Sequence, residues 1–380
     1  MISVLLPRSL RRGFSVLLRG VLLWQCVILS VQAAPAKRKV ILDDDGFGVA
    51  QWMVVQDANT DVLGVTQVSG NRWLAWNTQW ALRALELANR SDIPVYSGAV
   101  FPLLNTEKST HLWEQRYGKL IWKGAWQREW VEETEQSTPT YHAWDDVPDL
   151  PEGNPSTKAQ AEHAANFMIR MVHQYPGEVS IIATGPLTNI ALAQSLDPAF
   201  ASLAKELVYM GGSLQPQQTL NNTAAAQFAR EFINSPRREF NWRWDPEAVR
   251  IALRAPWRKI VMVPVDPSTD TQLTPALLKK MSRRDNALSK VVAGREPNFP
   301  LWDEIATGVW LDEGLIANAA ELYIDCVSEF GPSYGDTLSW SEDYRPHQGE
   351  QLQTVVKTVD VKGLEKLMIR LLNQPLFTGQ

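Results

Sequence analysis

A regular alternation of short apolar runs with longer amphipathic stretches constrains the fold of this chain most strongly. Several runs rich in β-branched residues have the length and composition of buried strands, and the segments between them show helical spacing. Such alternation predicts an α/β fold with an open, mainly parallel sheet that is covered by helices on both faces. The expected strands are Lys39–Leu42, Val62–Val68, Val179–Ala183, Glu206–Met210, Lys259–Val265 and Thr354–Val359, and the expected helices are Trp73–Ala88, Ala159–Val172, Leu187–Ser195, Pro246–Leu253 and Gly363–Leu372.

Residues 101–155 interrupt this alternation. The segment is rich in acidic residues, proline and tryptophan, and it shows neither strand nor helix periodicity. We expect an ordered insertion or lid, in which the aromatic residues either pack a peripheral subcore or stack on a ligand. The rest of the chain, with 45% hydrophobic and 21% charged residues, has enough apolar side chains for one large domain. The tryptophans of the insertion are Trp113, Trp122, Trp126, Trp130 and Trp144.

The first 33 residues have the features of a cleavable secretory signal. Four arginines and no acidic residue precede an apolar run, Val21–Val31, which ends in a small-residue site at Ala33. The run is roughly 11 residues long, well short of the ~20 that span a bilayer, so we expect no stable membrane anchor. The mature chain would be 34–380 and secreted or periplasmic. Arg11-Arg12-Gly13-Phe14 resembles a twin-arginine signal, which leaves the export route open.

Charge and cysteine content exclude some classes of function. The full chain has a net charge of −5, and loss of four arginines with the signal would make it more acidic. Such a surface does not attract nucleic acid or anionic membranes in general, and it fits a small neutral or cationic ligand better. Cys26 lies in the signal, so Cys326 has no intrachain disulfide partner; we expect it to be an inert buried thiol.

The first expected strand ends in three consecutive carboxylates, Asp43, Asp44 and Asp45, followed by Gly46. Open α/β sheets bind ligands beyond the carboxyl ends of their strands. Adjacent carboxylates repel each other unless a cation or hydrogen bonds neutralise them, and Ca²⁺ is the usual cation when oxygen ligands converge without histidine or cysteine. A solvated acidic turn is the alternative. The motif also fits the opening of haloacid dehalogenase-like phosphatases, except that Phe47 replaces a small polar residue.

The order of several further motifs resembles one family, the inosine–uridine-preferring nucleoside hydrolases. The resemblance extends from Lys39 to about Val327 and implies that family's fold, a Rossmann-like α/β sheet. Each motif is weak alone, but their order is specific. The motifs are Val62-Leu63-Gly64-Val65-Thr66, Ser69-Gly70-Asn71, Ala183-Thr184-Gly185-Pro186-Leu187-Thr188-Asn189-Ile190-Ala191-Leu192-Ala193, Met210-Gly211-Gly212, Glu239-Phe240-Asn241 and Asp245-Pro246-Glu247-Ala248.

This resemblance implies hydrolysis of the N-glycosidic bond of a ribonucleoside or related N-riboside, with Ca²⁺ as cofactor and a homo-oligomeric state. Such a reaction passes through a ribosyl cation, which needs a base for water, negative charge near the sugar and a firm hold on its hydroxyls. The resemblance implies that Asp45 activates water and binds metal with Asp43, Thr184 and Asp303, and that Asn71, Glu239 and Asn241 hold ribose. Without the family resemblance, the alternative interpretations are turn residues at Asn71 and Asn241, a helix cap at Thr184 and a solvated charge at Glu239.

Two departures from the family pattern affect the expected chemistry. Val49 and Ala50 stand where the family carries two more aspartates, and Trp302 stands where members often have a histidine before Asp303. Tryptophan cannot protonate a leaving base, although Trp302 could stack on one. Trp302-Asp303-Glu304 resembles a divergent, fungal-like branch of the family. A secreted riboside-binding protein without turnover is therefore the second hypothesis.

Overall fold

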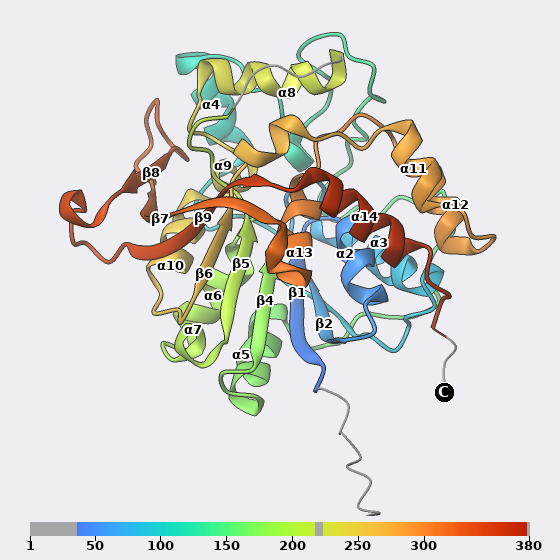
Figure 1. Cartoon of the computed structure of the whole chain (residues 1–380). Coiled ribbons are helices and arrows are strands. Elements are labelled where there is room, and N and C mark those ends of the chain that lie inside the picture. Colours follow the sequence, from blue (N-terminus) through green and yellow to red (C-terminus); the bar gives the residue numbers. More distant parts are fainter. Residues whose placement is uncertain (1–35, 217–222, 378–380) are drawn as a thin grey trace, which may run out of the picture. The chain divides into compact units, whose positions relative to one another are not determined.

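The computed structural model describes residues 36–216 and 223–377, and the expected signal segment lies outside them. The described residues form a nine-stranded sheet in the order β3-β2-β1-β4-β5-β6-β9-β7-β8 (Figure 1). All neighbours from β3 to β9 run parallel, while β7 pairs antiparallel with both β9 and β8. The strands are β1 Arg38–Asp44, β2 Thr60–Gln67, β3 Val95–Ser97, β4 Val179–Ala183, β5 Glu206–Met210, β6 Ile260–Val263, β7 Ile316–Cys326, β8 Thr337–Trp340 and β9 Gln351–Val359.

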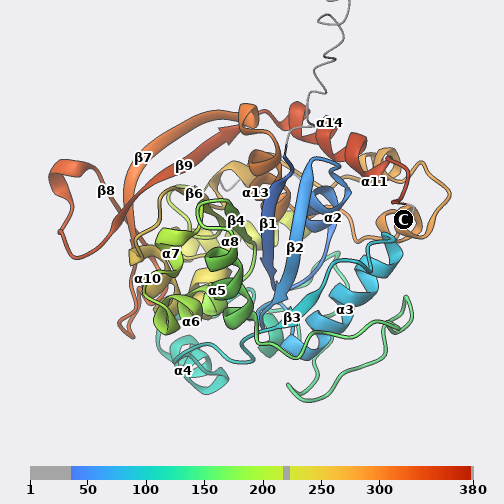
Figure 2. The ribbon, with the colours of Figure 1, turned by 90° about the horizontal axis from the view of Figure 1, so that it is seen from below.

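Helices cover both faces of this sheet, and each face has its own core (Figure 2). Alternate side chains of β1 enter different cores: Val40 and Leu42 pack on one face and Ile41 on the other. Because both faces of such a strand are buried, each side chain lies in one of the two cores. The strand is therefore apolar at every position, which explains its continuous apolar run in the sequence. One face carries α2 Val49–Gln56, α3 Leu74–Leu87, α11 Pro275–Met281, α12 Ala287–Ala293, α13 Trp302–Leu311 and α14 Val361–Leu372, and the other carries α5 Ala164–Gln174, α6 Thr188–Leu196, α7 Phe200–Leu203 and α10 Pro246–Arg254.

Strand β1 lies at the point where the strand order reverses. It pairs with β2 on one side and with β4 on the other, so the connections leaving β1 and β4 diverge to opposite faces. Asp43 aligns with Thr66 of β2 and with Ala183 of β4. In open α/β sheets a crevice at such a reversal receives the ligand. The carboxyl ends of β1, β2, β4 and β5 therefore converge where the sequence predicts the site.

The expected insertion, 101–155, contains one helix, α4 Glu107–Tyr117, and one 3₁₀ turn, η2 Gly124–Trp126. Figure 1 shows α4 and α8 Thr223–Asn234 beyond the same end of the sheet. Some of its tryptophans take the expected packing role, while stacking on a ligand stays a prediction. Trp126 stacks on Trp244 in a buried subcore, with ring centroids 4.1 Å apart, and Trp113 is buried in a second small cluster. Trp122 and Trp130 remain partly exposed.

The sequence predicted the central strands well and the edge of the sheet poorly. Strand β6 is shorter than the expected Lys259–Val265, because Pro264 cannot donate to the ladder and the 3₁₀ turn η3 Asp266–Asp270 follows. Strands β7 and β8 were not predicted; only the last three residues of β7 are buried, and the strand lacks a long apolar run. Cys326 is buried, as expected. Within the described residues, no helix has the length and apolar character needed to cross a membrane.

Candidate active site

Asp43 is fully buried at the end of β1. Its Oδ1 accepts hydrogen bonds from Thr66 Oγ1 at 2.6 Å and from Asn189 Nδ2 at 2.8 Å. Its second oxygen, Oδ2, has no hydrogen-bond partner. A buried carboxylate oxygen without a donor is costly unless a cation or an ordered water reaches it. Asn189 lies inside the Ala183–Ala193 motif, but sequence reasoning had given it no role.

Asp44 faces the start of α6 and the first turn of α2. Thr184 Oγ1 donates to Asp44 Oδ1 at 2.8 Å, and Gln51 Nε2 donates to Thr184 Oγ1 at 3.0 Å. Asp44 Oδ2 is also buried without a partner. Thr184 does not cap the following helix, since the N-cap residue of α6 is Leu187. The helix-cap interpretation of Thr184 is therefore wrong, and its hydroxyl serves the carboxylate instead.

Asp45 is buried, and Asn71 binds both of its carboxylate oxygens. The backbone N–H of Asn71 donates to Oδ2 at 2.6 Å and its side-chain Nδ2 donates to Oδ1 at 3.1 Å. A Cβ at Gly70 would lie 2.1 Å from Asp45 Oδ2, so only glycine permits this approach. Asn71 itself is exposed. The buried carboxylate is thus hydrogen-bonded to a residue that is itself exposed, and Asn71 is more than a turn residue.

Glu239 is the N-cap of the short helix α9 Phe240–Trp244, and Asn241 lies in its first turn. Glu239 is buried and accepts hydrogen bonds from three backbone N–H groups, those of Gly212, Asn241 and Trp242. Asn241 Nδ2 donates to the carbonyl oxygens of Thr184 at 3.3 Å and Met210 at 3.2 Å. The interpretations of Glu239 as a solvated charge and of Asn241 as a turn residue are wrong. The two residues join the ends of β4 and β5.

Asp303 and Trp302 begin α13, and both are partly exposed. Burial raises the pKa of Asp303 well above its usual range, and the charges of Asp44, Glu304, Asp45 and Glu239 raise it further. Asp303 therefore belongs to the same electrostatic cluster as the strand-end carboxylates. The Trp302 ring contacts Phe228 of α8, with centroids 5.2 Å apart in edge-to-face geometry.

The cluster is rich in carboxylates that lack ion pairs. Burial raises the pKa of Asp43, Asp45 and Glu239 to about 7 in each case, and that of Asp44 well above its usual range. No Lys or Arg among the described residues forms a salt bridge with any of these four or with Asp303. Such unpaired, pKa-shifted groups at a strand edge mark a functional site.

The turn that departs from the family pattern is part of the hydrophobic core. Val49 and Ala50 are each 2% exposed, and Phe47 packs edge to face on Trp52. The guanidinium of Arg295 lies close by, with Nη2 3.1 Å from the position that a Cβ of Gly48 would take. Burial lowers the pKa of Arg295, and the charges of Glu304 and Asp44 are among those that oppose this. No sequence signal had pointed to Arg295, a single arginine in a loop.

Six partly exposed rings form a continuous series above the carboxylates, here called the aromatic arc. Its second ring, Trp122, donates from Nε1 to Asn71 Oδ1 at 2.8 Å, and its fifth, Trp302, directly precedes Asp303 at the start of α13. Successive ring centroids are 5.2–6.3 Å apart. The members, in order, are Phe240, Trp122, Trp130, Phe228, Trp302 and Phe299.

Comparisons with known proteins agree with the family resemblance. The model of the family described as inosine-uridine preferring nucleoside hydrolase matches residues 40–366. An uncharacterized protein of Schizosaccharomyces pombe is 28% identical over 85% of this chain and 81% of its own length. A pyrimidine-specific ribonucleoside hydrolase of Escherichia coli is 26% identical over 80% of this chain and 87% of its own length.

Solved structures show the same fold. A plant nucleoside hydrolase superposes with a TM-score of 0.64 at 23% identity, covering 89% of this chain and 99% of its own. An inosine-guanosine nucleoside hydrolase superposes with a TM-score of 0.65 at 18% identity, covering 88% and 98%. The predicted fold class is confirmed.

Proposed function

Because the chain belongs to the inosine-uridine preferring nucleoside hydrolase family, we propose that its strand-end site hydrolyses the N-glycosidic bond of a ribonucleoside or related N-riboside. The observation that carries this proposal is the pair formed by Asp45 and Asn71. A buried carboxylate, oriented through both oxygens, lies directly beneath an exposed amide. This arrangement supports Asp45 as the base and Asn71 as a ribose-binding group.

In this mechanism Asp45 removes a proton from the attacking water. Burial raises the pKa of Asp45 to about 7, near the value at which a general base is most effective in neutral solution. The bond to the heterocycle breaks as positive charge develops on the ribosyl ring, and the ionised carboxylates around Asp45 stabilise that charge. Asn71, through its second amide hydrogen, and Asn241 would hold ribose hydroxyls. Glu239 would orient Asn241 through the backbone of α9.

Two buried oxygens of the site have the chemistry that a calcium ion needs. Asp43 Oδ2 and Asp44 Oδ2 are buried carboxylate oxygens with no partner, and Ca²⁺ prefers such ligands. Asp43, Asp45, the Thr184 carbonyl and Asp303 would hold the ion, which would lower the pKa of a bound water. Among the described residues, no three Asp, Glu, His or Cys side chains are already gathered as a metal site. With Val49 and Ala50 in place of two carboxylates, we expect weaker binding than at a full family site.

The alternatives make different predictions. The match of the family model to residues 40–366 leaves no support for a haloacid dehalogenase-like phosphatase. A riboside-binding protein without turnover would share every contact described above and would differ only in rate.

Export through the segment 1–33 and assembly into a homo-oligomer remain parts of the proposal. N-terminal sequencing of the mature protein and light scattering test them.

The decisive experiment measures turnover of p-nitrophenyl riboside and of uridine by the purified protein, with and without added Ca²⁺. We expect release of p-nitrophenolate that chelator abolishes and Ca²⁺ restores. Binding of ribose to the same protein, measured by calorimetry, serves as the control for an intact site. A folded, calcium-loaded protein that binds ribosides but cleaves neither substrate would overturn the proposal in favour of the binding protein.

A further inference from the structure

Arg72 and Arg295 lie against one cluster of three tryptophans. The guanidinium carbon of Arg72 is 4.4 Å from the centroid of the Trp76 ring, and that of Arg295 is 5.8 Å from the centroid of Trp52. Trp80 joins the two rings, with its centroid 6.2 Å from Trp76 and 6.3 Å from Trp52. The two arginines therefore flank the same cluster, although one comes from the loop after β2 and the other from the loop before α13.

The tryptophan cluster lies against the turn between β1 and α2. Trp80 Nε1 donates to the carbonyl oxygen of Phe47 at 2.7 Å. Arg295 Nη2 lies 3.1 Å from the position that a Cβ of Gly48 would take. The first turn of α2, which begins at this point, carries no acidic residue. The turn that departs from the family pattern thus places a guanidinium beside it but offers that guanidinium no carboxylate.

Neither guanidinium has a counter-ion in direct contact. Both side chains are partly exposed, and neither forms a salt bridge or a side-chain hydrogen bond with any other described residue. Burial lowers the pKa of Arg72, and the positive charge of Arg295 lowers it further. Two like charges that approach each other without a counter-ion are unfavourable, and a bound anion would relieve that repulsion.

Four carboxylates act on Arg295 from a greater distance. They oppose the effect of burial on its pKa, but none of them forms a salt bridge with it. In order of effect they are Glu304, Glu152, Asp44 and Glu296. Two of them bind other groups: Asp44 accepts a hydrogen bond from Thr184, and Glu296 accepts two from Ser137. The N–H donors of Arg295 are therefore left for a ligand.

The chemistry of two unpaired guanidiniums is that of a phosphate site. Planar guanidinium groups bind phosphate oxygens through paired N–H donors, and such contacts are about twice as strong as hydrogen bonds between neutral groups. The chain as a whole is acidic, with a net charge of −5, so the pair is a local exception that fits one phosphate better than a polyanion. Arg72 directly follows Asn71, which binds Asp45. An anion on the two arginines would therefore be close to a ribose held by Asn71.

We propose that Arg72 and Arg295 form a phosphate subsite, and that the substrates are N-ribosides phosphorylated on the ribose, which are nucleoside monophosphates. This inference rests on the proposed function and names its substrate class. The phosphate takes no part in bond cleavage. The anomeric carbon gains the hydroxyl group of water, and the heterocycle nitrogen keeps the electron pair of the broken bond and receives the remaining proton. The products are a ribose phosphate and a free base.

Ligand binding to the full-length Asp45→Asn protein tests the subsite, because this variant should not consume the ligands. Calorimetry in one buffer gives the dissociation constants of uridine, of its three ribose monophosphates and of inorganic phosphate. We expect at least one monophosphate to bind more tightly than uridine by on the order of tenfold or more, as for hydrogen bonds to a charged group. The monophosphate with the largest gain identifies which ribose oxygen faces the arginines.

Two results of this titration would overturn the inference. One is a set of equal dissociation constants for uridine and all three monophosphates. The other is binding of inorganic phosphate with no gain for any monophosphate, because the arginines would then hold a free anion and not a substrate.

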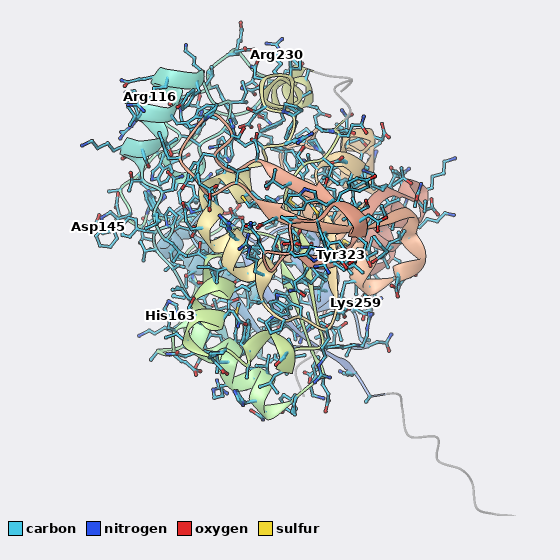
Figure 3. The ribbon with its side chains drawn as sticks, turned by 90° about the vertical axis from the view of Figure 1, so that its left-hand side faces the viewer. Arg116, Asp145, His163, Arg230, Lys259 and Tyr323 are labelled. Carbon is cyan, nitrogen blue, oxygen red and sulfur yellow. The ribbon has the colours of Figure 1, made fainter. Side chains whose placement is uncertain are left out.

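Arginine variants in the same background locate the effect. Arg295→Gln and Arg72→Gln each remove one charge and should each bring the best monophosphate to within about threefold of uridine. Arg295→Lys keeps the charge but loses the paired donors, and should retain part of the preference. Arg116→Gln is the matched control and should keep the full preference, because Arg116, labelled in Figure 3, is an exposed arginine of α4 that also lacks a salt bridge. A preference that survives both Arg295→Gln and Arg72→Gln would overturn the inference. Each variant is judged by a ratio of two dissociation constants, which a smaller folded fraction does not change.

Turnover separates this inference from the proposed function. If the wild-type protein cleaves p-nitrophenyl riboside but has no higher kcat/KM for any uridine monophosphate than for uridine, the hydrolase proposal stands and the phosphate subsite fails. If it cleaves no riboside, phosphorylated or not, the proposed function itself fails. Cleavage of a monophosphate in preference to uridine, lost in Arg295→Gln and kept in Arg116→Gln, is the result expected if both are correct.

Discussion

The strand-end carboxylates and the aromatic arc form two sides of one site, but they are built in different ways. Asp43, Asp44 and Asp45 are almost completely buried, and each is fixed by donors from an adjoining strand end or loop. The rings of the arc are partly exposed and come from the insertion, α8, α9, the loop before α13 and the start of α13. In the proposed function the buried side would carry the chemistry, and the exposed side would contact the leaving group.

The largest expected effect falls on the buried side. Asp45→Asn should lower turnover of p-nitrophenyl riboside by at least ~10⁴-fold, because an amide can neither accept a proton nor balance the developing ribosyl charge. Asp145→Asn, an exposed aspartate of the insertion, is the control and should retain activity. Steady-state kinetics with an unchanged melting temperature provides the measurement. Substantial activity of Asp45→Asn would place the catalytic base elsewhere.

The next prediction concerns the exposed side. Without an acid near Trp302, uridine should be cleaved more slowly than p-nitrophenyl riboside by 10²–10⁴-fold, the range usual for general acid catalysis. Trp302→His should narrow this gap by raising the rate on uridine, whereas Trp302→Phe should leave it unchanged. The ratio of the two kcat/KM values is the quantity to compare. Similar rates of the wild-type protein on both substrates would show that another group protonates the base.

The same contrast explains what the sequence could predict. Asp43, Thr184 and Asn189 lie within short motifs at strand ends, and parallel pairing alone brings such ends together, so the buried side could be inferred from motif order. The arc could not, because Trp130 meets Phe228 of α8 only through the path of the irregular insertion, which has no periodicity that would predict its course. Arg295 was not predicted because it also lies in a loop without periodicity. The antiparallel strand β7 was missed because only its last three residues are buried, so it has no long apolar run.

The pH dependence of the stability of the metal-free protein should show the energetic cost of burying these ionised carboxylates. In the folded state burial raises the pKa of Asp43, Asp45 and Glu239 to about 7, whereas in the unfolded chain such groups ionise near pH 4. Between these values the folded state holds more protons. The free energy of unfolding should therefore fall, by on the order of a few kcal/mol, as pH rises from 4 to 7, and should level off above 7.

Thermal unfolding in chelator at pH 5 and at pH 7.5 tests this expectation. Ca²⁺ should raise the melting temperature more at pH 7.5, where the carboxylates are ionised, than at pH 5. Asp43→Asn removes one of the ionising groups and should flatten the pH dependence. A melting temperature that rises steadily from pH 5 to pH 7.5 in the absence of metal would contradict the raised pKa values of these buried carboxyls.

The smallest expected effect concerns Glu86 of α3, which anchors the chain just after the insertion. Burial raises the pKa of this carboxyl, but hydrogen bonds from Thr157, Ser156 and Arg83 outweigh that and lower it to about 2. Its ionised form therefore stabilises the fold above about pH 4.5, and this contribution is lost as pH falls toward 2. Glu86→Gln should lower the free energy of unfolding at pH 7 by roughly 1–2 kcal/mol, since the contacts are hydrogen bonds to a charged group near the surface.

The difference in the free energy of unfolding between Glu86→Gln and the wild type should shrink toward pH 3. Glu321→Gln, at an exposed position of β7, should change stability by less than about 0.5 kcal/mol. Denaturant titrations at pH 7 and pH 3 give both values, and a Glu86→Gln effect that persists undiminished at pH 3 would show that shape, not charge, holds the insertion to α3.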